Sequence, residues 1–205
     1  MRLKPQIVVA GILDTKGVEI EFLAQRIRAA GGEPIVLELS LKKEMGWANI
    51  NLTTLLSKAG RSPEELASVP RSEAVEIILA PAIEIIREMT AQGGVDGMIA
   101  FGGSTGTTMA AKIMRELPIG MPKLMLSTMA SGDVSSYVGT RDIAMLFPIA
   151  EAGLNVITRR ILNYAAAAIV GMASPPPLPS IEIKPLIGWW IILRPVFYLG
   201  LGIKK

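Results

Sequence analysis

The 205-residue sequence contains no cysteine and no histidine. The absence of cysteine excludes a disulfide framework. The absence of histidine excludes His general bases, Ser-His-Asp and Cys-His catalytic arrangements, and His-ligated zinc. Any catalysis must therefore depend on carboxylates, Lys, Arg, hydroxyl groups, backbone N–H groups or a hard metal ion.

The sequence also has little excess of either positive or negative charge. The formal net charge is +3 and no long basic run occurs, so the chain lacks the electrostatic footprint of nucleic-acid binding. Half of the residues are hydrophobic and 19% are charged, a composition that supports a sizeable core and argues against global disorder. The length suits one medium domain, or one domain with a fragment of a second.

Long uninterrupted hydrophobic runs are absent as well. The short apolar run before Asp14 is typical of a buried strand rather than of a signal peptide with a cleavage site. The apolar stretch Leu186–Ile203 is interrupted by Arg194-Pro195 and contains three glycines, so it falls short of a membrane span. We therefore expect a cytoplasmic protein with no membrane and no nucleic-acid partner.

The first forty residues predict a strand, a helix and a second strand. Gln6–Leu13 is apolar and rich in β-branched residues, as in a strand buried on both faces. Gly17–Ala30 has apolar residues at helical spacing, and Gly31-Gly32 ends the pattern. Pro34–Leu39 is the second predicted strand. Such βαβ units form parallel sheets.

The later elements continue this alternation. We predict three further strands, over Asp96–Phe101, Lys123–Ser127 and, as a fifth candidate strand, Ile143–Phe147. The predicted helices are a short one beginning at Ser62-Pro63, a long one over Val75–Met89 that Pro81 kinks, and two more over Thr107–Glu116 and Leu154–Met172. The predicted fold class is therefore α/β, with a Rossmann-like open, mostly parallel sheet flanked by helices.

The domain organisation follows from a cluster of prolines after the last predicted helix. Ser174–Pro179 is typical of a stiff polyproline linker. We expect the Rossmann-like domain over residues 1–173, the Pro-rich linker over 174–183, and a short non-domain tail over 184–205. The tail contains one strand-like run and too little material to form a core.

Three loops are candidate binding segments, because loops at the carboxyl ends of parallel strands line the ligand crevice. The first is Gly11–Gly17, where a helix N-terminus favours an anion and Lys16 adds a positive charge. Thr15 adds a hydroxyl, and Asp14 suits Mg²⁺ or ribose hydroxyls better than a phosphate. The alternative is that Asp14 or Thr15 caps the helix and Lys16 is solvated.

The second loop follows the third predicted strand and is rich in glycine and hydroxyl groups. Glycines allow a close backbone approach to an anion, and the hydroxyl residues add donors; these positions are Gly102, Gly103, Ser104, Thr105, Gly106, Thr107 and Thr108. The loop has neither the Walker A lysine nor the G-x-G-x-x-G spacing. We interpret it as a phosphate-binding loop; the alternative is a glycine-rich turn with Thr107 as the helix cap.

The third loop follows the fourth predicted strand. Its turn, Ser131-Gly132-Asp133, can present a carboxylate. Further on, the guanidinium of Arg141 can bind a phosphate or pair with Asp142. Both interpretations of Arg141 stay open at this point.

Several motifs, in order, resemble the Tm-one-like ATP-binding family. They are GILDTKGVE at Gly11–Glu19, GVDGMIAFGGSTGT at Gly94–Thr107, KLMLSTMASGD at Lys123–Asp133, YVGTRDI at Tyr137–Ile143 and AGLNVITRRIL at Ala152–Leu162. The resemblance implies a Rossmann-like N-terminal domain that binds ATP, often in a dimer, and a second α/β domain in full-length members. It also implies a protein partner, as in the plant resistance protein that typifies the family. The matching site positions are Asp14, Thr15, Lys16, Gly102, Gly103, Ser104, Gly106, Thr107, Ser131, Gly132 and Asp133.

Three departures from the family pattern stand out. Ile12 replaces the usual Thr, and Thr105 replaces a third Gly, which restricts the loop if that position needs a positive φ. Lys184–Gly188 resembles the opening strand of the second domain, but the pattern is then lost. We therefore expect residues 184–205 to be a truncated or aberrant start of that domain.

The predicted function is an ATP-binding module that uses helix N-termini and a glycine-rich loop, with Mg²⁺ near Asp14 or Asp133 and a homodimer or a protein partner. One alternative is a Mg²⁺-dependent ATP hydrolase or phosphotransferase, with Lys16 on the phosphates and Asp133 orienting the nucleophile. Another is a non-functional truncated remnant. The sequence identifies no catalytic base and no metal ligand set.

Overall fold

The structure, a computed structural model, describes residues 4–149 and 153–175. Its strands form one sheet in the order β2-β1-β3-β4-β5, and every pair of neighbours is parallel. This confirms the predicted open α/β sheet, with parallel pairing throughout. The strands are β1 (Gln6–Gly11), β2 (Glu33–Glu38), β3 (Gly97–Gly102), β4 (Lys123–Ser127) and β5 (Ala144–Leu146).

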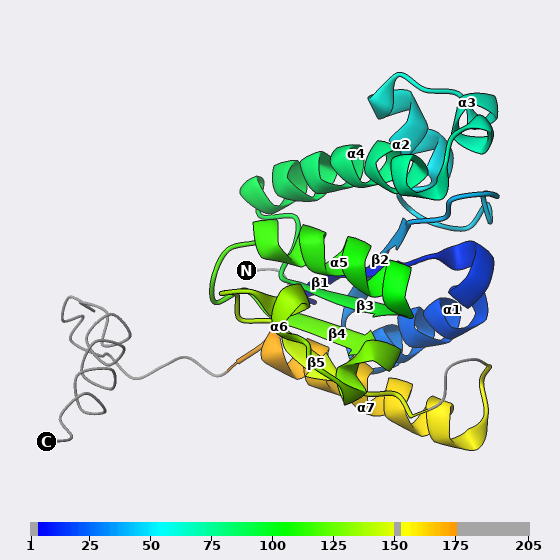
Figure 1. Cartoon of the computed structure of the whole chain (residues 1–205). Coiled ribbons are helices and arrows are strands. Elements are labelled where there is room, and N and C mark those ends of the chain that lie inside the picture. Colours follow the sequence, from blue (N-terminus) through cyan, green and yellow to red (C-terminus); the bar gives the residue numbers. More distant parts are fainter. Residues whose placement is uncertain (1–3, 150–152, 176–205) are drawn as a thin grey trace, which may run out of the picture. The chain divides into compact units, whose positions relative to one another are not determined.

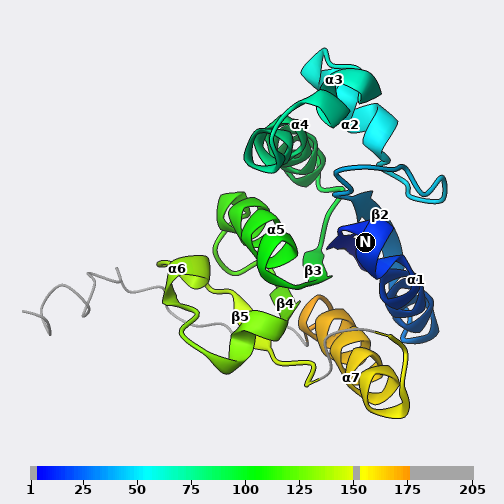
Figure 2. The same ribbon diagram turned by 45° about the vertical axis from the view of Figure 1, so that its right-hand side comes forward.

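Helices cover both faces of the sheet (Figures 1 and 2). The first face carries α1 (Leu13–Ala29) and α7 (Val156–Met172), which pack against each other. The opposite face carries α4 (Arg71–Ala91) and α5 (Ser104–Glu116). The remaining helical segments are α2 (Leu52–Ala59), α3 (Pro63–Ser68), the short η1 (Thr128–Ser131) and α6 (Ser135–Val138).

The interior strand β1 shows why the apolar runs form strands. Its side chains alternate between two cores, with Ile7 and Val9 facing α1 and α7, and Val8 and Ala10 facing α4 and α5. All four are fully buried. A strand covered on both faces needs apolar residues at every position, which is the pattern that the sequence shows.

Residues 176–205 lie outside the described residues. They include most of the predicted Pro-rich linker (174–183) and all of the predicted tail (184–205). In the described ranges, none of the helices is both long enough and apolar enough to cross a membrane.

The predicted helix starts are wrong at the two candidate loops. α1 begins at Leu13 rather than Gly17, and α5 begins at Ser104 rather than Thr107. Glycine usually marks a loop, but Gly17 and Gly106 lie inside the helices. Most of each predicted loop is therefore the first turn of a helix.

Two other helices depart from the prediction. α2 was not predicted; the side chain of Asn51 caps it by accepting a hydrogen bond from the N–H of Thr54. α4 begins at Arg71, upstream of its predicted start, and continues past Pro81.

Candidate functional site

The candidate site lies between β1 and β3, from which successive strands are added toward opposite edges of the sheet. β1 and β3 are neighbours in the sheet but not in the chain, and the helices that follow them, α1 and α5, cover opposite faces. In open parallel sheets of this order, ligands bind in the crevice at the carboxyl ends of such a strand pair. Here these ends are Gly11 and Gly102.

A cavity of about 190 Å³ occupies this crevice. Its lining includes seven of the predicted site residues, from two segments far apart in the sequence: Thr15, Lys16, Gly102, Gly103, Ser104, Thr105 and Gly106. Ile12 and Arg71 complete the lining. The structure therefore brings the first two candidate segments together at one site.

The close contact between β3 and α5 explains one of the glycines. A Cβ atom on Gly102 would lie 2.9 Å from the Cα of Gly106, which is backbone that has no room to move. At Gly103 the nearest atom would be the Oγ1 of Thr128 at 3.7 Å, an ordinary contact. Only the first of these glycines is required by packing.

The first turn of α5 supplies free donors to the cavity. The first N–H groups of a helix have no acceptor within it, and Ser104, Thr105 and Gly106 occupy these positions. Gly103 precedes the helix and provides no side-chain cap. The amides are therefore available to an anion, and the helix dipole adds a partial positive charge.

Lys16 lies beside the cavity with its ammonium held in place. The residue has non-helical dihedral angles (φ −128°, ψ 17°) within α1. Its Nζ is 3.7 Å from Oε1 of the buried Glu19 and 5.4 Å from the ring centroid of Phe101. The side chain is only 11% exposed, so the alternative of a solvated Lys16 is wrong.

Asp14 and Thr15 do not cap α1. The helix has no side-chain cap, and the hydroxyl of Thr15 donates to the carbonyl of Ile12 at 3.0 Å. The N–H of Asp14 donates instead to Oγ of the buried Ser40 at 3.1 Å. The predicted capping alternative is therefore wrong.

Two buried carboxylate oxygens beside this turn have no hydrogen-bond partner among the residues that the structure describes. They are Oδ1 of Asp14 and Oε2 of Glu38. Ser40 connects the two residues, because its hydroxyl also donates to the other oxygen of Glu38 at 2.8 Å. Asp14 does not line the cavity itself.

Arg71 is a site residue that the sequence did not reveal. It opens α4 and its Nη2 donates to the hydroxyl of Thr105 at 3.3 Å. No motif surrounds Arg71, and its approach to the glycine-rich segment depends on how α4 packs beside α5. It adds a second cation to the cavity.

Thr107 contributes to the core rather than to the cavity. Its side chain is fully buried, and its hydroxyl shares a 2.6 Å hydrogen bond with the hydroxyl of Ser127. This pair joins α5 to the end of β4. Thr107 is neither the helix cap nor part of the cavity lining.

The third candidate loop does not join this cavity. Ser131, Gly132 and Asp133 are absent from its lining. Asp133 accepts a hydrogen bond from the N–H of Ser135 at 2.9 Å at the start of α6, and this bond lowers the pKa of the Asp133 carboxyl. Arg141 lines a different cavity, between α4 and α5.

The donor set fits a phosphate better than it fits a metal ion. Lys16, Arg71 and the free amides of α5 are all donors or cations. Across residues 4–149 and 153–175, no cluster of three or more metal-ligating acidic side chains occurs. Asp14 offers one unpaired buried oxygen, whereas Asp133 is engaged at α6.

The fold and this cavity define a doubly wound α/β domain whose candidate site lies at the switch point of its sheet. Residues 5–176 match the N-terminal domain of the uncharacterised protein family UPF0261. The chain belongs to this family.

Three curated relatives illustrate the relationship. The chain is 35% identical to a UPF0261 protein of Clostridium tetani over 91% of this chain and 47% of the relative. It is 37% identical to a UPF0261 protein of Rhizobium meliloti, over 89% of this chain and 46% of the relative. It is 29% identical to the ToMV susceptible protein tm-1(GCR26) of Solanum lycopersicum, over 82% of this chain and 25% of the relative.

These relatives confirm the resemblance to the Tm-one-like family. The chain spans about half the length of the two bacterial relatives.

Proposed function

We propose that the cavity at the β1–β3 switch point binds the phosphate groups of a nucleotide, and that the nucleotide is ATP. The single observation that carries this proposal is the convergence of Lys16, Arg71 and the first turn of α5 on one cavity. Arg71, Lys16 in its ion pair with Glu19, and a helix N-terminus with a partial charge of roughly +0.5 together offer cationic donors to an anion.

The size of the cavity limits what it encloses. At about 190 Å³ it is smaller than the roughly 300–1,000 Å³ of typical small-molecule sites. It accommodates phosphate groups, and the nucleoside would extend along the carboxyl edge of the sheet. Asp14 lies in the turn that carries Lys16, and its unpaired oxygen is buried next to the cavity lining rather than part of it.

The side of the site near β1 matches the hydrogen-bonding needs of a nucleotide or its metal ion. A carboxylate accepts from ribose hydroxyls or binds Mg²⁺ through oxygen. Asp14 would supply that oxygen by turning its carboxylate toward the cavity, while Lys16 would bind phosphate oxygens as a point charge.

The phosphotransferase alternative depends on Asp133 to orient the nucleophile, and Asp133 is not at this site. Asp133 does not line the cavity and its carboxylate is bound to α6. We therefore propose a binding module rather than a phosphotransferase. The homodimer, the protein partner and the cytoplasmic location are further proposals, supported by the family relationship alone.

Titration calorimetry of the full chain with ATP, ADP, AMP and inorganic triphosphate, with and without Mg²⁺, tests the proposal. We expect ATP to bind more tightly than AMP, because the contacts are to phosphates. Arg71→Ala should weaken ATP binding about tenfold or more, the effect of losing a charge-assisted hydrogen bond.

Arg28→Ala is the matched control, since Arg28 is an exposed cation in the last turn of α1, at the opposite end from Lys16. An absence of binding heat with every triphosphate would refute the proposed function.

A further inference from the structure

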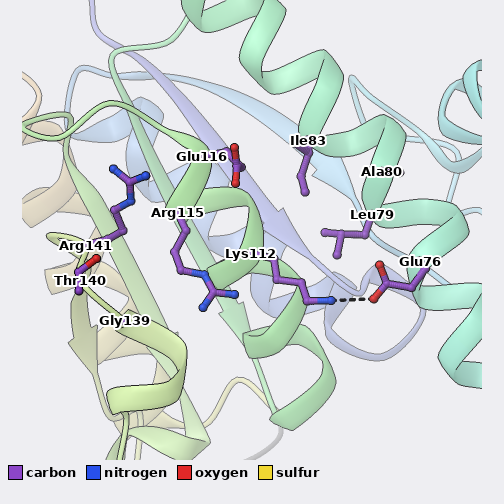
Figure 3. A pocket seen from close by; sticks show the side chains of 10 residues that line it. All are labelled: Glu76, Leu79, Ala80, Ile83, Lys112, Arg115, Glu116, Gly139, Thr140 and Arg141. Carbon is purple, nitrogen blue, oxygen red and sulfur yellow. Dashed lines mark hydrogen bonds and ion pairs between the residues drawn. The ribbon is translucent and has the colours of Figure 1, made fainter.

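A second and larger cavity lies away from the proposed nucleotide site. It has a volume of about 610 Å³ and is bordered by α4, α5 and the turn that follows α6 (Figure 3). We call it the α4–α5 cleft. This volume falls within the range of small-molecule sites, whereas the switch-point cavity does not.

The cleft has an apolar wall and a cationic wall. Leu79, Ala80 and Ile83 of α4 form the apolar wall. Arg115 of α5 and Arg141 of the turn supply guanidinium groups from the other side. A site with these two walls suits a ligand that is apolar at one end and anionic at the other.

Asp142 is engaged by other groups, and its neighbour Arg141 lines the cleft. The two carboxylate oxygens of Asp142 bind Nζ of Lys123 and the N–H of Gly120, each at 2.8 Å. Asp142 therefore does not pair with its neighbour. In the described part of the chain, the guanidinium of Arg141 forms no hydrogen bond or ion pair.

Arg115 is positioned by the same turn. Its Nη1 donates to the carbonyl of Ser136 at 3.4 Å. Gly139 has a positive φ of 59°, and a Cβ atom there would lie 3.8 Å from Cδ of Arg115. The turn thus packs against the stem of Arg115 and leaves donors of the guanidinium for a ligand.

The charges that line the cleft leave a positive balance. Lys112 and Glu76 neutralise each other in an ion pair of 2.7 Å that joins α5 to α4 (Figure 3). Glu116 offsets one of the two charges of Arg115 and Arg141, so one positive charge is left for an anion. The two guanidinium groups point in different directions (Figure 3), and each offers paired N–H donors to a carboxylate or a phosphate.

We propose that the α4–α5 cleft binds a small amphipathic anion. Its carboxylate or phosphate contacts Arg141, Arg115 adds positive charge to the same wall, and its apolar part lies on Leu79 and Ile83. This site is separate from the nucleotide site and does not depend on it.

The test is a nuclear magnetic resonance titration of the isotope-labelled full chain with hexanoate and with hexyl phosphate. The two controls are 1-hexanol, which lacks the anion, and inorganic phosphate, which lacks the apolar part. We expect saturable shifts of the amides of Gly139, Thr140 and Arg141 with at least one of the two anions. The tighter-binding anion identifies the head group.

Two variants make the assignment specific. Arg141→Gln and Ala80→Glu change exposed positions, and each should weaken binding about tenfold or more. Arg28→Gln removes the same charge elsewhere and should leave binding unchanged. Equal affinity of Arg141→Gln and the unaltered protein would overturn the proposal. So would equal shifts with 1-hexanol, an absence of saturable shifts, or shifts confined to Gly102–Gly106.

Discussion

The ammonium of Lys123 is fully buried and binds the carboxylate of Asp142 at 2.8 Å. The same nitrogen donates to the carbonyls of Pro118 and Met121 at 2.8 and 2.7 Å. The side chain of Lys123 thus connects the start of β4 to the segment that precedes β5.

Replacing Lys123 with Met should destabilise the domain by about 1–3 kcal/mol, because the Asp142 carboxylate and two backbone carbonyls lose their donor. Urea unfolding followed by circular dichroism measures the change. Lys43→Met, at an exposed position, should change stability by less than about 0.5 kcal/mol. A Lys123→Met variant as stable as the unaltered protein would contradict this role.

The same pair predicts a dependence of stability on pH. Burial acts to raise the pKa of the Asp142 carboxyl, but the hydrogen bonds from Lys123 and Gly120 outweigh it and hold that pKa below its ordinary value. A carboxyl with a lowered pKa in the folded state stabilises the fold fully above its unfolded pKa of about 3.9. That stabilisation is lost as the pH falls through the folded-state pKa.

We therefore expect the difference in unfolding free energy between the unaltered protein and Asp142→Asn to be constant near neutral pH. Below about pH 4 the difference should shrink. Denaturant unfolding at a series of pH values measures it. A difference that grows with acidity would show that the sign is wrong.

The two adjacent glycines at the end of β3 should respond differently to alanine. Gly102→Ala places a Cβ atom 2.9 Å from the Cα of Gly106, so we expect a loss of about 1–3 kcal/mol from overpacking and weaker ATP binding. Gly103→Ala meets only an ordinary contact and should be tolerated. Thermal unfolding and calorimetry compare the two variants, and equal effects would contradict the packing argument.

Thr105 and Thr107 provide a second matched comparison. Thr107→Val removes a buried hydroxyl bonded to Ser127 and should cost about 1–2 kcal/mol of stability, with little effect on ATP affinity. Thr105→Val removes the acceptor of Arg71 at the cavity, so ATP affinity should fall while stability changes little. Reversed effects would show that the cavity is wrongly placed.

Much of the sheet could be predicted from the sequence, since its strands lie between two cores. The run at Gln6–Gly11 is apolar throughout because both faces are covered. The helix starts could not be predicted in the same way. Gly17 and Gly106 indicate loops by composition, yet each lies in the first turns of a helix.

The candidate site was predictable only in part. Lys16 and the glycines after β3 follow strands directly, and carboxyl ends of neighbouring parallel strands meet at one edge. Arg71 and the separation of Arg141 from this site were not predictable. Both depend on how helices pack on one face of the sheet, which no local pattern encodes.

The sequence by itself determined the alternation of strands and helices, the two cores and the position of two candidate binding segments in the chain. These depend on the local periodicity of apolar residues and on glycine. Only the tertiary structure decided which side chains share a cavity. The partners of Arg71, Thr107 and Asp142 come from distant segments, so their roles exist only once the sheet and its helices are packed.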